Sequence, residues 1–202
     1  MNEQLSRRER KKRETRQRLM EAASALLRER GYEATTVEQI AEAADVAKGT
    51  FFNYFATKEA ILPAIAARLL QQLEETLSPE RGAPASPVAR IKLALCLMSD
   101  DPLCEPRLAR RLFTAVMRHR GIHPGLALRD LLTKQVRQAQ AAGEIRAELN
   151  PIYLGNVISA LFFQQLMMWH HGYRPAPLPE LLDETVDLLL DGIAGPNWRQ
   201  SF

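Results

Sequence analysis

Two short interruptions in an otherwise helix-forming segment most constrain the fold of this chain of 202 residues. Between residues 16 and 77, apolar side chains recur about every 3.6 positions, which is the period of an amphipathic helix. Breaks are expected at residues 45–47 and 56–57, and they leave room for only a short helix from Lys48 to Phe55. A helix, a three-residue turn and a short helix together predict a helix-turn-helix arrangement.

Start and stop signals support this division of the segment. Gly31 follows the apolar stripe of the first helix and is expected to end it. Thr36 and Gln39 have the spacing of a capping box, in which each side chain binds the backbone N–H of the other residue. Thr57 is expected to cap a longer fourth helix. The predicted helices of this segment cover residues 16–30, 37–44, 48–55 and 58–77.

The rest of the chain has the same helical character, interrupted by loops rich in proline and glycine. Pro151 fits the first position of a helix, where the missing N–H costs nothing. Further helices are predicted at residues 88–99, 107–118, 126–142, 151–171 and 180–193. These patterns predict an all-α fold of about nine helices. We expect a helix-turn-helix domain over residues 1–60, with a basic arm at 1–14, and a second helical domain over 61–202.

The positive charge of the chain is concentrated at one end. The formal net charge is +3, whereas residues 1–30 contain ten Lys or Arg against five Asp or Glu, so the remaining residues carry −2. The basic run from Arg7 to Arg18 has two explanations: a solvated helix face or arm, or an electrostatic footprint for a polyanion such as DNA. The motif that follows the run favours DNA.

Several classes of protein and site are not expected. The N-terminal residues lack the apolar core of a signal peptide, and Leu154–Trp169 is too short and too polar to span a bilayer comfortably. Cys96 and Cys104 match no metal or redox spacing, and a reducing, cytoplasmic setting is the simplest interpretation. We find no nucleophile motif, phosphate loop or paired carboxylates. The chain is therefore expected not to be an enzyme, to need no cofactor or metal, and to have no membrane partner.

The short helix from Lys48 presents two different faces. At about 100° per residue, its three phenylalanines gather on one side, where they are expected to pack inward. That group comprises Phe51, Phe52 and Phe55. The opposite side presents a glycine with no side chain, a hydroxyl, an amide and a phenol. These polar groups suit base edges and phosphates. That set comprises Gly49, Thr50, Asn53 and Tyr54.

Three residues in this region are locally unfavourable. Lys48 and Lys58 stand at predicted helix starts, where the helix dipole disfavours a cation, and Gly49 lies inside a helix. A bound phosphate would reverse the first penalty, because helix N-termini bind anions. A missing side chain at Gly49 would let a DNA backbone or base edge approach closely. Each residue alone is more often an ordinary surface residue, so the joint pattern carries the DNA-binding hypothesis.

At this point the sequence TRQRLMEAASALLRERGYEATTVEQIAEAADVAKGTFFNYFATKEAIL, Thr15 to Leu62, resembles the tetracycline-repressor (TetR) family of bacterial transcription regulators. The resemblance implies a DNA-binding three-helix unit and a helical domain that dimerises and holds an effector pocket. Residues implied to bind phosphates are Thr36, Tyr54 and Lys58. Residues implied to face the major groove are Lys48, Gly49, Thr50, Phe52 and Asn53. Ala47 departs from the usual Ser or Thr cap, and Asn53 stands where an aromatic residue or histidine is common, so base preference does not transfer.

The last two predicted helices are apolar on nearly every side. A helix of this kind must be buried on every side, either as a central core helix or against a second subunit. We favour a two-fold homodimer, which would bind a near-palindromic double-stranded DNA operator. The predicted interface residues are Leu161, Leu182, Val186 and Leu189.

The effector pocket has the weakest sequence signal. Its candidates are apolar, with adaptable methionines, and each is also explained by an ordinary core position. They are Met98, Phe113, Met117, Phe162, Phe163, Met167 and Trp169. We expect a repressor released from its operator by an unidentified small-molecule effector. The alternative is a DNA-bound regulator or adaptor controlled by a protein partner.

Overall fold

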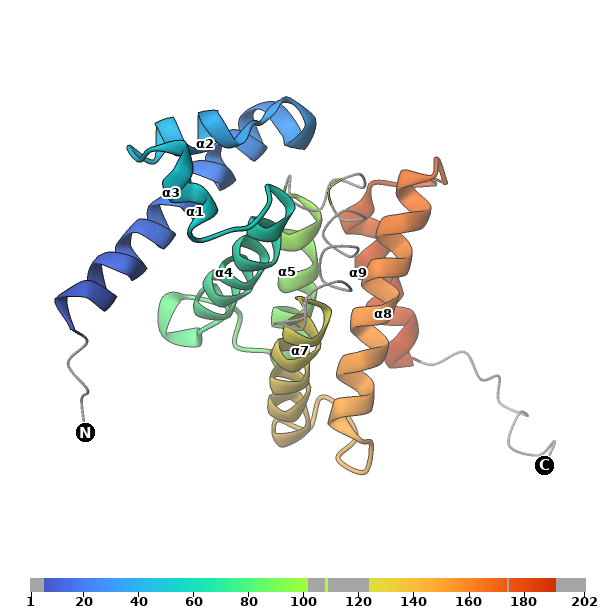
Figure 1. Cartoon of the computed structure of the whole chain (residues 1–202). Helices are drawn as coiled ribbons and strands as arrows, with labels where there is room; N and C mark the ends of the chain where they lie inside the picture. The colour runs from blue at the N-terminus through green and yellow to red at the C-terminus, as the bar shows by residue number, and fades with distance from the viewer. Residues whose placement is uncertain (1–5, 102–107, 109–123, 174, 192–202) are drawn as a thin grey trace, which may run out of the picture. The chain divides into compact units, whose positions relative to one another are not determined.

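The computed structural model describes residues 6–101, 108, 124–173 and 175–191. These residues form eight α-helices and two short 3-10 helices, with no strand in the described ranges. Figure 1 shows how the helices follow one another along the chain. The predicted all-α class is therefore confirmed. The helix expected at residues 107–118 lies outside the described residues, apart from Leu108.

The chain divides into two compact units, which are described separately. Residues 1–69 with 107–124 form one unit, here called the recognition unit, and residues 70–106 with 125–202 form the C-terminal unit. The division expected between residues 60 and 61 stays a prediction about independently folding domains.

The first helix, α1, runs from Arg7 to Ala34 and therefore includes most of the expected basic arm. It begins before Arg16 because Ser6 and Glu9 form a capping box: the Ser6 hydroxyl accepts from the Glu9 backbone N–H at 3.2 Å, and the Glu9 carboxylate accepts from the Ser6 N–H at 2.9 Å. This box satisfies backbone donors that would otherwise fray the first turn. Gly31, with φ of 75°, interrupts the helix where an end was predicted.

The helix-turn-helix pair follows directly. Helix α2 spans Val37–Ala43, and its predicted capping box is confirmed: Thr36 Oγ1 accepts from the Gln39 N–H, and Gln39 Oε1 accepts from the Thr36 N–H. The turn contains Asp45 at φ 52°, a left-handed conformation that a short polar residue tolerates. Helix α3 spans Lys48–Phe52 and is shorter than expected.

The core of the recognition unit is built on α1, α2 and α3. Leu19 and Phe51 are fully buried, and Phe55 is 4% exposed. The Arg16 guanidinium lies 5.2 Å from the centre of the Phe55 ring, so α1 contacts the chain three residues beyond the end of α3. Phe52 is 45% exposed, so the prediction that all three phenylalanines pack inward is wrong for this one. Its ring meets Phe51 edge-on rather than entering the core.

A short 3-10 helix, η1 (Glu59–Ile61), leads into α4 (Leu62–Thr76). The Thr57 hydroxyl accepts from the Ala60 N–H at 3.3 Å, as expected of a cap. Helix α4 is continuous from the recognition unit into the C-terminal unit.

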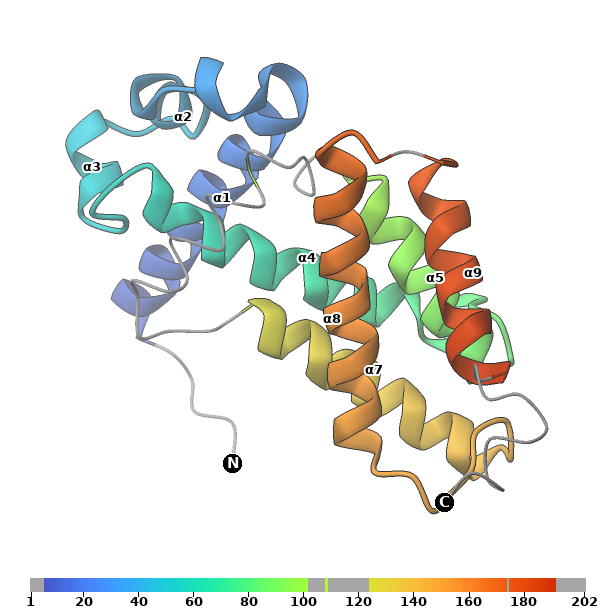
Figure 2. The same ribbon diagram turned by 90° about the vertical axis from the view of Figure 1, so that its right-hand side faces the viewer.

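The C-terminal unit is a helical bundle. After the 3-10 helix η2 (Pro79–Arg81), its helices are α5 (Pro87–Ser99), α7 (Pro124–Ala141), α8 (Pro151–His170) and α9 (Leu178–Asp191). Helix α9 packs against both α5 and α8, as Figure 2 shows. Leu128, Leu132 and Val136 form the fully buried stripe of α7. Pro151 occupies the first turn of α8 as predicted, after the Asn150 cap.

One glycine is explained by helix packing. A Cβ atom on Gly155 of α8 would lie 2.9 Å from the Thr133 backbone nitrogen and would also collide with the Thr133 side chain. Real Cβ atoms do not approach backbone this closely, so α7 and α8 cross only because this side chain is missing.

Candidate nucleic-acid interface

The exposed surface of α3 contains most of the residues predicted to face DNA. Lys48, Gly49, Phe52 and Asn53 are exposed, and Thr50 is half-buried. In the turn after α3, Tyr54 is half-buried. These groups offer an ammonium, hydroxyls, an amide and an apolar ring, which is the chemistry that reads base edges in a major groove.

Gly49 has no packing reason within the described chain. A Cβ atom added there would meet nothing within 4 Å, and the backbone is not in the left-handed region. An alanine would therefore fit and would favour the helix.

Lys48 is held by Glu38, a residue that the sequence analysis did not single out. The Lys48 ammonium forms an ion pair with the Glu38 carboxylate across α2 and α3. The hydrogen bond from Lys48 is the main cause that lowers the pKa of Glu38. Both side chains are more than half exposed, so the pair contributes little to stability. In this arrangement the ammonium lies beside Glu38 of α2, next to the exposed residues of α3.

Lys58 has a structural role that the helix-dipole argument missed. Its ammonium donates to the backbone carbonyls of Tyr32 at 2.8 Å and Thr35 at 2.7 Å, at the C-terminal end of α1. The ammonium also lies 3.9 Å from the centre of the Tyr32 ring. A helix C-terminus carries partial negative charge and favours a cation. The expected local penalty is therefore offset by a long-range contact.

Tyr32 makes a second link to the same segment. Its hydroxyl donates to Glu59 Oε1 at 2.6 Å, and this hydrogen bond is the main cause that lowers the pKa of Glu59. The Tyr32 side chain is only 6% exposed. Tyr32, Lys58 and Glu59 thus tie the end of α1 to the start of the segment that becomes α4.

The helix that carries the recognition surface lacks a side-chain cap. Ala47 occupies the N-cap of α3 and makes no side-chain hydrogen bond to the helix. The departure noted in the sequence is thus a missing side-chain cap in the structure, at the start of a short helix.

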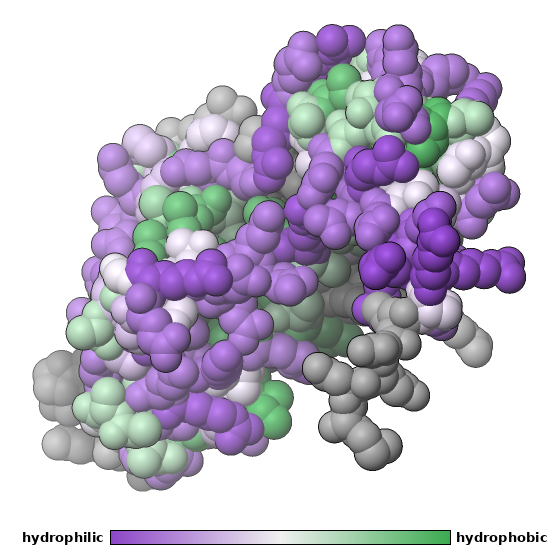
Figure 3. Space-filling model, turned by 90° about the vertical axis from the view of Figure 1, so that its left-hand side faces the viewer, coloured by the Kyte–Doolittle hydropathy of each residue, from purple (hydrophilic) through white to green (hydrophobic). Residues whose placement is uncertain are grey.

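Basic side chains cover the N-terminal turns of α1. All residues from Arg7 to Arg13 are exposed, and Figure 3 shows strongly hydrophilic side chains over this part of the recognition unit. One exposed ion pair, between Arg10 and Glu14 at 3.8 Å, lies in this stretch.

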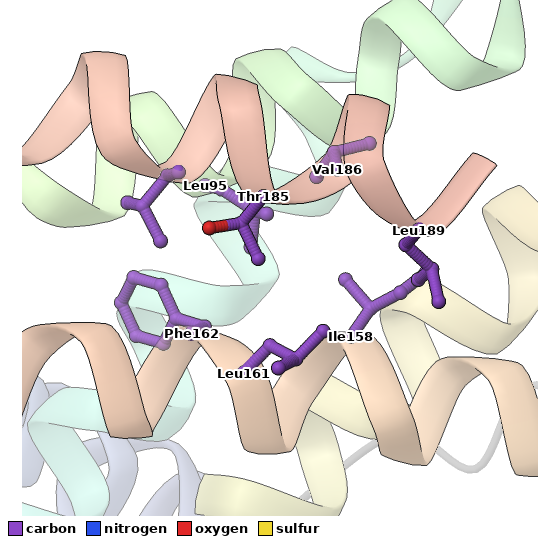
Figure 4. Close-up of a pocket in the computed structure, with 8 residues that line it drawn as sticks. Leu95, Ile158, Leu161, Phe162, Thr185, Val186 and Leu189 are labelled. Carbon is purple, nitrogen blue, oxygen red and sulfur yellow. The ribbon is translucent and has the colours of Figure 1, made fainter. Parts of the chain in front are cut away.

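A small pocket lies between α5, α8 and α9. Figure 4 shows side chains from α8 and α9 that point toward one another across it. Its enclosed volume is about 10 Å³, room for roughly one water molecule. The lining is apolar except for Thr185, whose hydroxyl is held by Gln165 Nε2 at 2.9 Å. The lining residues are Leu95, Ile158, Leu161, Phe162, Leu182, Thr185, Val186 and Leu189.

Of the predicted effector residues that the structure describes, Phe162 alone lines this pocket. Phe163 is 37% exposed and is not brought to it. The Trp169 indole N–H donates to the Ala176 carbonyl at 3.1 Å, and neither Trp169 nor Met98 lines the pocket. Met167 is half-buried elsewhere on α8. The remaining candidates, Phe113 and Met117, lie outside the described residues.

The predicted dimer residues divide into two groups. Leu182 and Val186 are 2% and 3% exposed: their side chains lie in the chain's own core, which leaves little of their surface for a partner. Residues of α9 three or four positions apart lie on the same face, and this face is turned toward α5 and α8. Leu161 and Leu189 are half-buried and remain predictions.

Helix α8 exposes much of its apolar surface in the single chain. Ile152, Tyr153, Phe163 and Met168 are between 37% and 66% exposed. By length and composition, the stretch Pro151–Trp169 of this helix could cross a membrane. Its mean hydropathy is 1.2, and 28% of the stretch is buried inside the protein. The same test is passed by helices that pack against protein, so the expectation of no membrane partner stays a prediction. Within the described residues, no group of three His, Cys, Asp or Glu side chains could hold a metal ion.

Comparisons with known proteins agree on one family. The family model described as bacterial regulatory proteins, tetR family, matches residues 19–65. The chain is 29% identical over 190 residues to the HTH-type transcriptional repressor KstR of Rhodococcus jostii, covering 91% of this chain and 86% of that protein. It is 54% identical over 54 residues, 27% of this chain and 24% of the relative, to the HTH-type transcriptional regulator TcmR of Streptomyces glaucescens.

A solved structure extends the similarity across both units. The chain resembles Thermus thermophilus FadR, a TetR family transcriptional repressor in complex with lauroyl-CoA, with a TM-score of 0.64 and 28% identity. The alignment covers 89% of this chain and 95% of that one. The capped α2, the exposed surface of α3 and these similarities have one explanation: residues 19–65 form a TetR-family DNA-binding domain, and the chain is a TetR-like DNA-binding transcriptional regulator.

Proposed function

We propose that this protein is a homodimeric repressor that binds a near-palindromic operator in the cytoplasm and is released from it by a small, largely apolar ligand. The observation that carries the DNA part is the α3 surface, with the gap at Gly49 beside exposed Lys48 and Asn53. A gap that no packing explains, at the start of a helix with polar exposed neighbours, suits close approach by a duplex.

The roles of individual residues follow from their chemistry. Asn53 and Thr50 read base edges by hydrogen bonds, and the exposed ring of Phe52 makes apolar contact with thymine methyl groups. Lys48 and Gly49 face the same groove. Thr36, Tyr54 and Lys58 bind phosphates and set the register, since phosphate contacts position a protein without reading sequence.

A second copy of the chain would cover the exposed apolar side chains of α8 and α9. Leu188 and Leu190 of α9 are 57% and 40% exposed. Leu189, between them in α9, and Leu161 of α8 are half-buried. Two-fold symmetry would then place two α3 helices on two half-sites about one helical turn, or a small multiple of it, apart.

The ligand is proposed to contain an alkyl or ring system. The pocket between α5, α8 and α9 is apolar apart from the Thr185 hydroxyl, and the similar FadR structure contains lauroyl-CoA. The small volume of this pocket means that a ligand of that size needs α8 and α9 to separate. Acyl thioesters are therefore the first compounds to test.

Helix α4 is the element proposed to transmit binding. It leaves the recognition unit just after the link formed by Tyr32, Lys58 and Glu59 and continues into the C-terminal unit. A shift of α4 would change the spacing of two recognition helices, whereas half-site spacing in DNA is fixed. The ligand must bind the released state more tightly, and DNA must weaken ligand binding by the same factor.

The test is a genome-wide selection of bound DNA, repeated with Thr50→Ala and Asn53→Ala and with medium-chain and long-chain acyl-CoA added. A near-palindrome whose preferred bases change in each variant, by about 1–3 kcal/mol per lost base contact, supports the proposal. Ligand affinity is then measured with and without the selected operator. Equal affinities would show that the compound is not the signal, and failure of all apolar ligands would favour control by a protein partner.

A further inference from the structure

Helix α1 continues beyond the core that it packs on. Its buried side chains begin at Leu19 and recur at Ala23, Leu26 and Leu27, whereas residues 7–14 upstream are all exposed. The capping box at Ser6 nevertheless keeps those upstream turns helical. The direction of each side chain there follows from helix geometry.

Three cations continue the core-facing side of α1. At about 100° per residue, Arg8, Lys12 and Arg16 lie within roughly 50° of the mean direction of the buried residues. Arg7 and Arg10 point about 150° away from that direction. The first set, here called the basic stripe, spans about 12 Å of the helix axis, with one cation every four residues, or about 6 Å.

The contact between Arg16 and Phe55 orients the basic stripe. The Arg16 guanidinium lies over the Phe55 ring, and Phe55 follows α3 in the chain. The side of α1 that bears Arg16 therefore faces Phe55, three residues beyond the end of α3. Arg8 and Lys12 lie farther along that same side, beyond the last buried residue.

The basic stripe is unfavourable for the protein alone. Arg8, Lys12 and Arg16 are spaced four apart, and like charges at this spacing repel on a helix. Among the described residues, none of the three has a carboxylate within ion-pair distance, whereas Arg10 on the opposite side pairs with Glu14. An external polyanion would remove this repulsion.

We propose that the basic stripe, Arg8 and Lys12 with Arg16 as its inner end, is a second DNA-binding surface that holds backbone phosphates next to the site read by α3. This inference rests on the proposed DNA-binding function and adds a surface to it. A duplex carries about one phosphate charge per 3.4 Å on each strand, so cations about 6 Å apart along a helix can meet separate phosphates. The contribution is independent of base sequence.

The test compares two double variants of the full chain with equal loss of charge. Arg8→Gln with Lys12→Gln removes the outer part of the basic stripe, and Arg7→Gln with Arg10→Gln removes two cations from the opposite side of the same turns. Binding to a mixed-sequence DNA duplex is measured between about 50 and 200 mM salt. Circular dichroism confirms that helix content is unchanged.

The first variant should lower the slope of log affinity against log salt by about two units, since each phosphate contact contributes about 0.9. The second should leave the slope nearly unchanged. Equal reductions of this slope in both variants would indicate diffuse electrostatic attraction and would overturn the proposed role of the basic stripe. An unchanged slope in both variants would overturn it as well. If the wild-type chain binds no duplex at all, the proposed function itself fails, which is a different result.

Discussion

Single residues in this protein have roles that depend on both local and distant neighbours. Lys58 is unfavourable at the start of η1 when only its own helix is considered, yet its ammonium caps the carbonyl end of α1. A charged donor to a carbonyl contributes more than a neutral hydrogen bond. The same ammonium is proposed to bind phosphate, so one residue connects folding and DNA binding.

We expect Lys58→Ala to reduce both stability and DNA affinity. Loss of two hydrogen bonds from a half-buried ammonium should lower the free energy of unfolding by roughly 1–3 kcal/mol. Loss of one phosphate contact should weaken binding to all sequences alike and lower the salt slope by about one unit. Urea titrations and salt-dependent DNA binding measure the two effects. Lys134→Ala, which removes an exposed lysine paired with Glu74, is the matched control.

The hydrogen bond from Tyr32 to Glu59 should make stability depend on pH. Because the pKa of Glu59 in the folded protein lies below its ordinary value of 4.5, its contribution is present above that value and is lost as the pH falls through the folded pKa. Tyr32→Phe should therefore cost about 1 kcal/mol at neutral pH and progressively less in acid. Denaturant titrations from neutral to acidic pH test this. Tyr153→Phe, at a 66% exposed position, should show no such trend.

At the scale of elements, α3 is short, uncapped and open at Gly49, and each feature lowers its own stability. The helix persists because Phe51 is fully buried beneath it, so tertiary packing outweighs local propensity. Recognition helices of this kind exchange local stability for an accessible surface.

Gly49→Ala should separate stability from binding. Because nothing in the protein opposes the added Cβ, the variant should be more stable by about 0.5–1 kcal/mol. DNA affinity should fall, since the methyl group occupies the space that a duplex would use. Ala47→Ser is the companion variant: it should stabilise α3 through a cap, by about 1 kcal/mol, without filling the gap. Unchanged affinity in Gly49→Ala would mean that the duplex does not approach there.

At the scale of the whole molecule, the exposed apolar side chains of α8 and α9 require an explanation. Phe163 and Leu188 are 37% and 57% exposed in the single chain. Exposed apolar surface rimmed by polar residues marks interaction sites. A second copy of the chain is the partner that the symmetry of DNA-binding dimers favours.

Leu161→Glu and Leu189→Glu should therefore give monomers or insoluble protein, because each places a charge in the proposed interface. Sedimentation at micromolar concentration measures the assembly state, and Ala142→Glu at an exposed loop position is the control. A wild-type chain that sediments as a monomer would rule out the dimer. Monomeric variants should bind a half-site but lose most affinity for the near-palindrome.

The sequence by itself determined the class of fold and the polar, open face of α3. Helical periodicity, the box of Thr36 with Gln39 and the break near Gly31 depend on residues within one or two turns of one another, so local chemistry decides them. The polar, open face of α3 was predictable for the same reason. The exposed position of Phe52 was not predictable in this way. Helix α3 ends at this residue, whereas the helical wheel assumed a helix that continued to Phe55.

Only the tertiary structure decided which apolar residues face inward and which charges are compensated. Leu182 and Val186 look like Leu189 in sequence, yet the packing of α9 on α5 and α8 buries the first two and leaves the third half-buried. Arg90 is 3% exposed and donates to Gln135 and to the Pro84 and Ala85 carbonyls, none of which its own helix supplies. The contact with Gln135 joins residues 45 positions apart, and the energies of all these contacts depend on distance and burial, which no local pattern specifies.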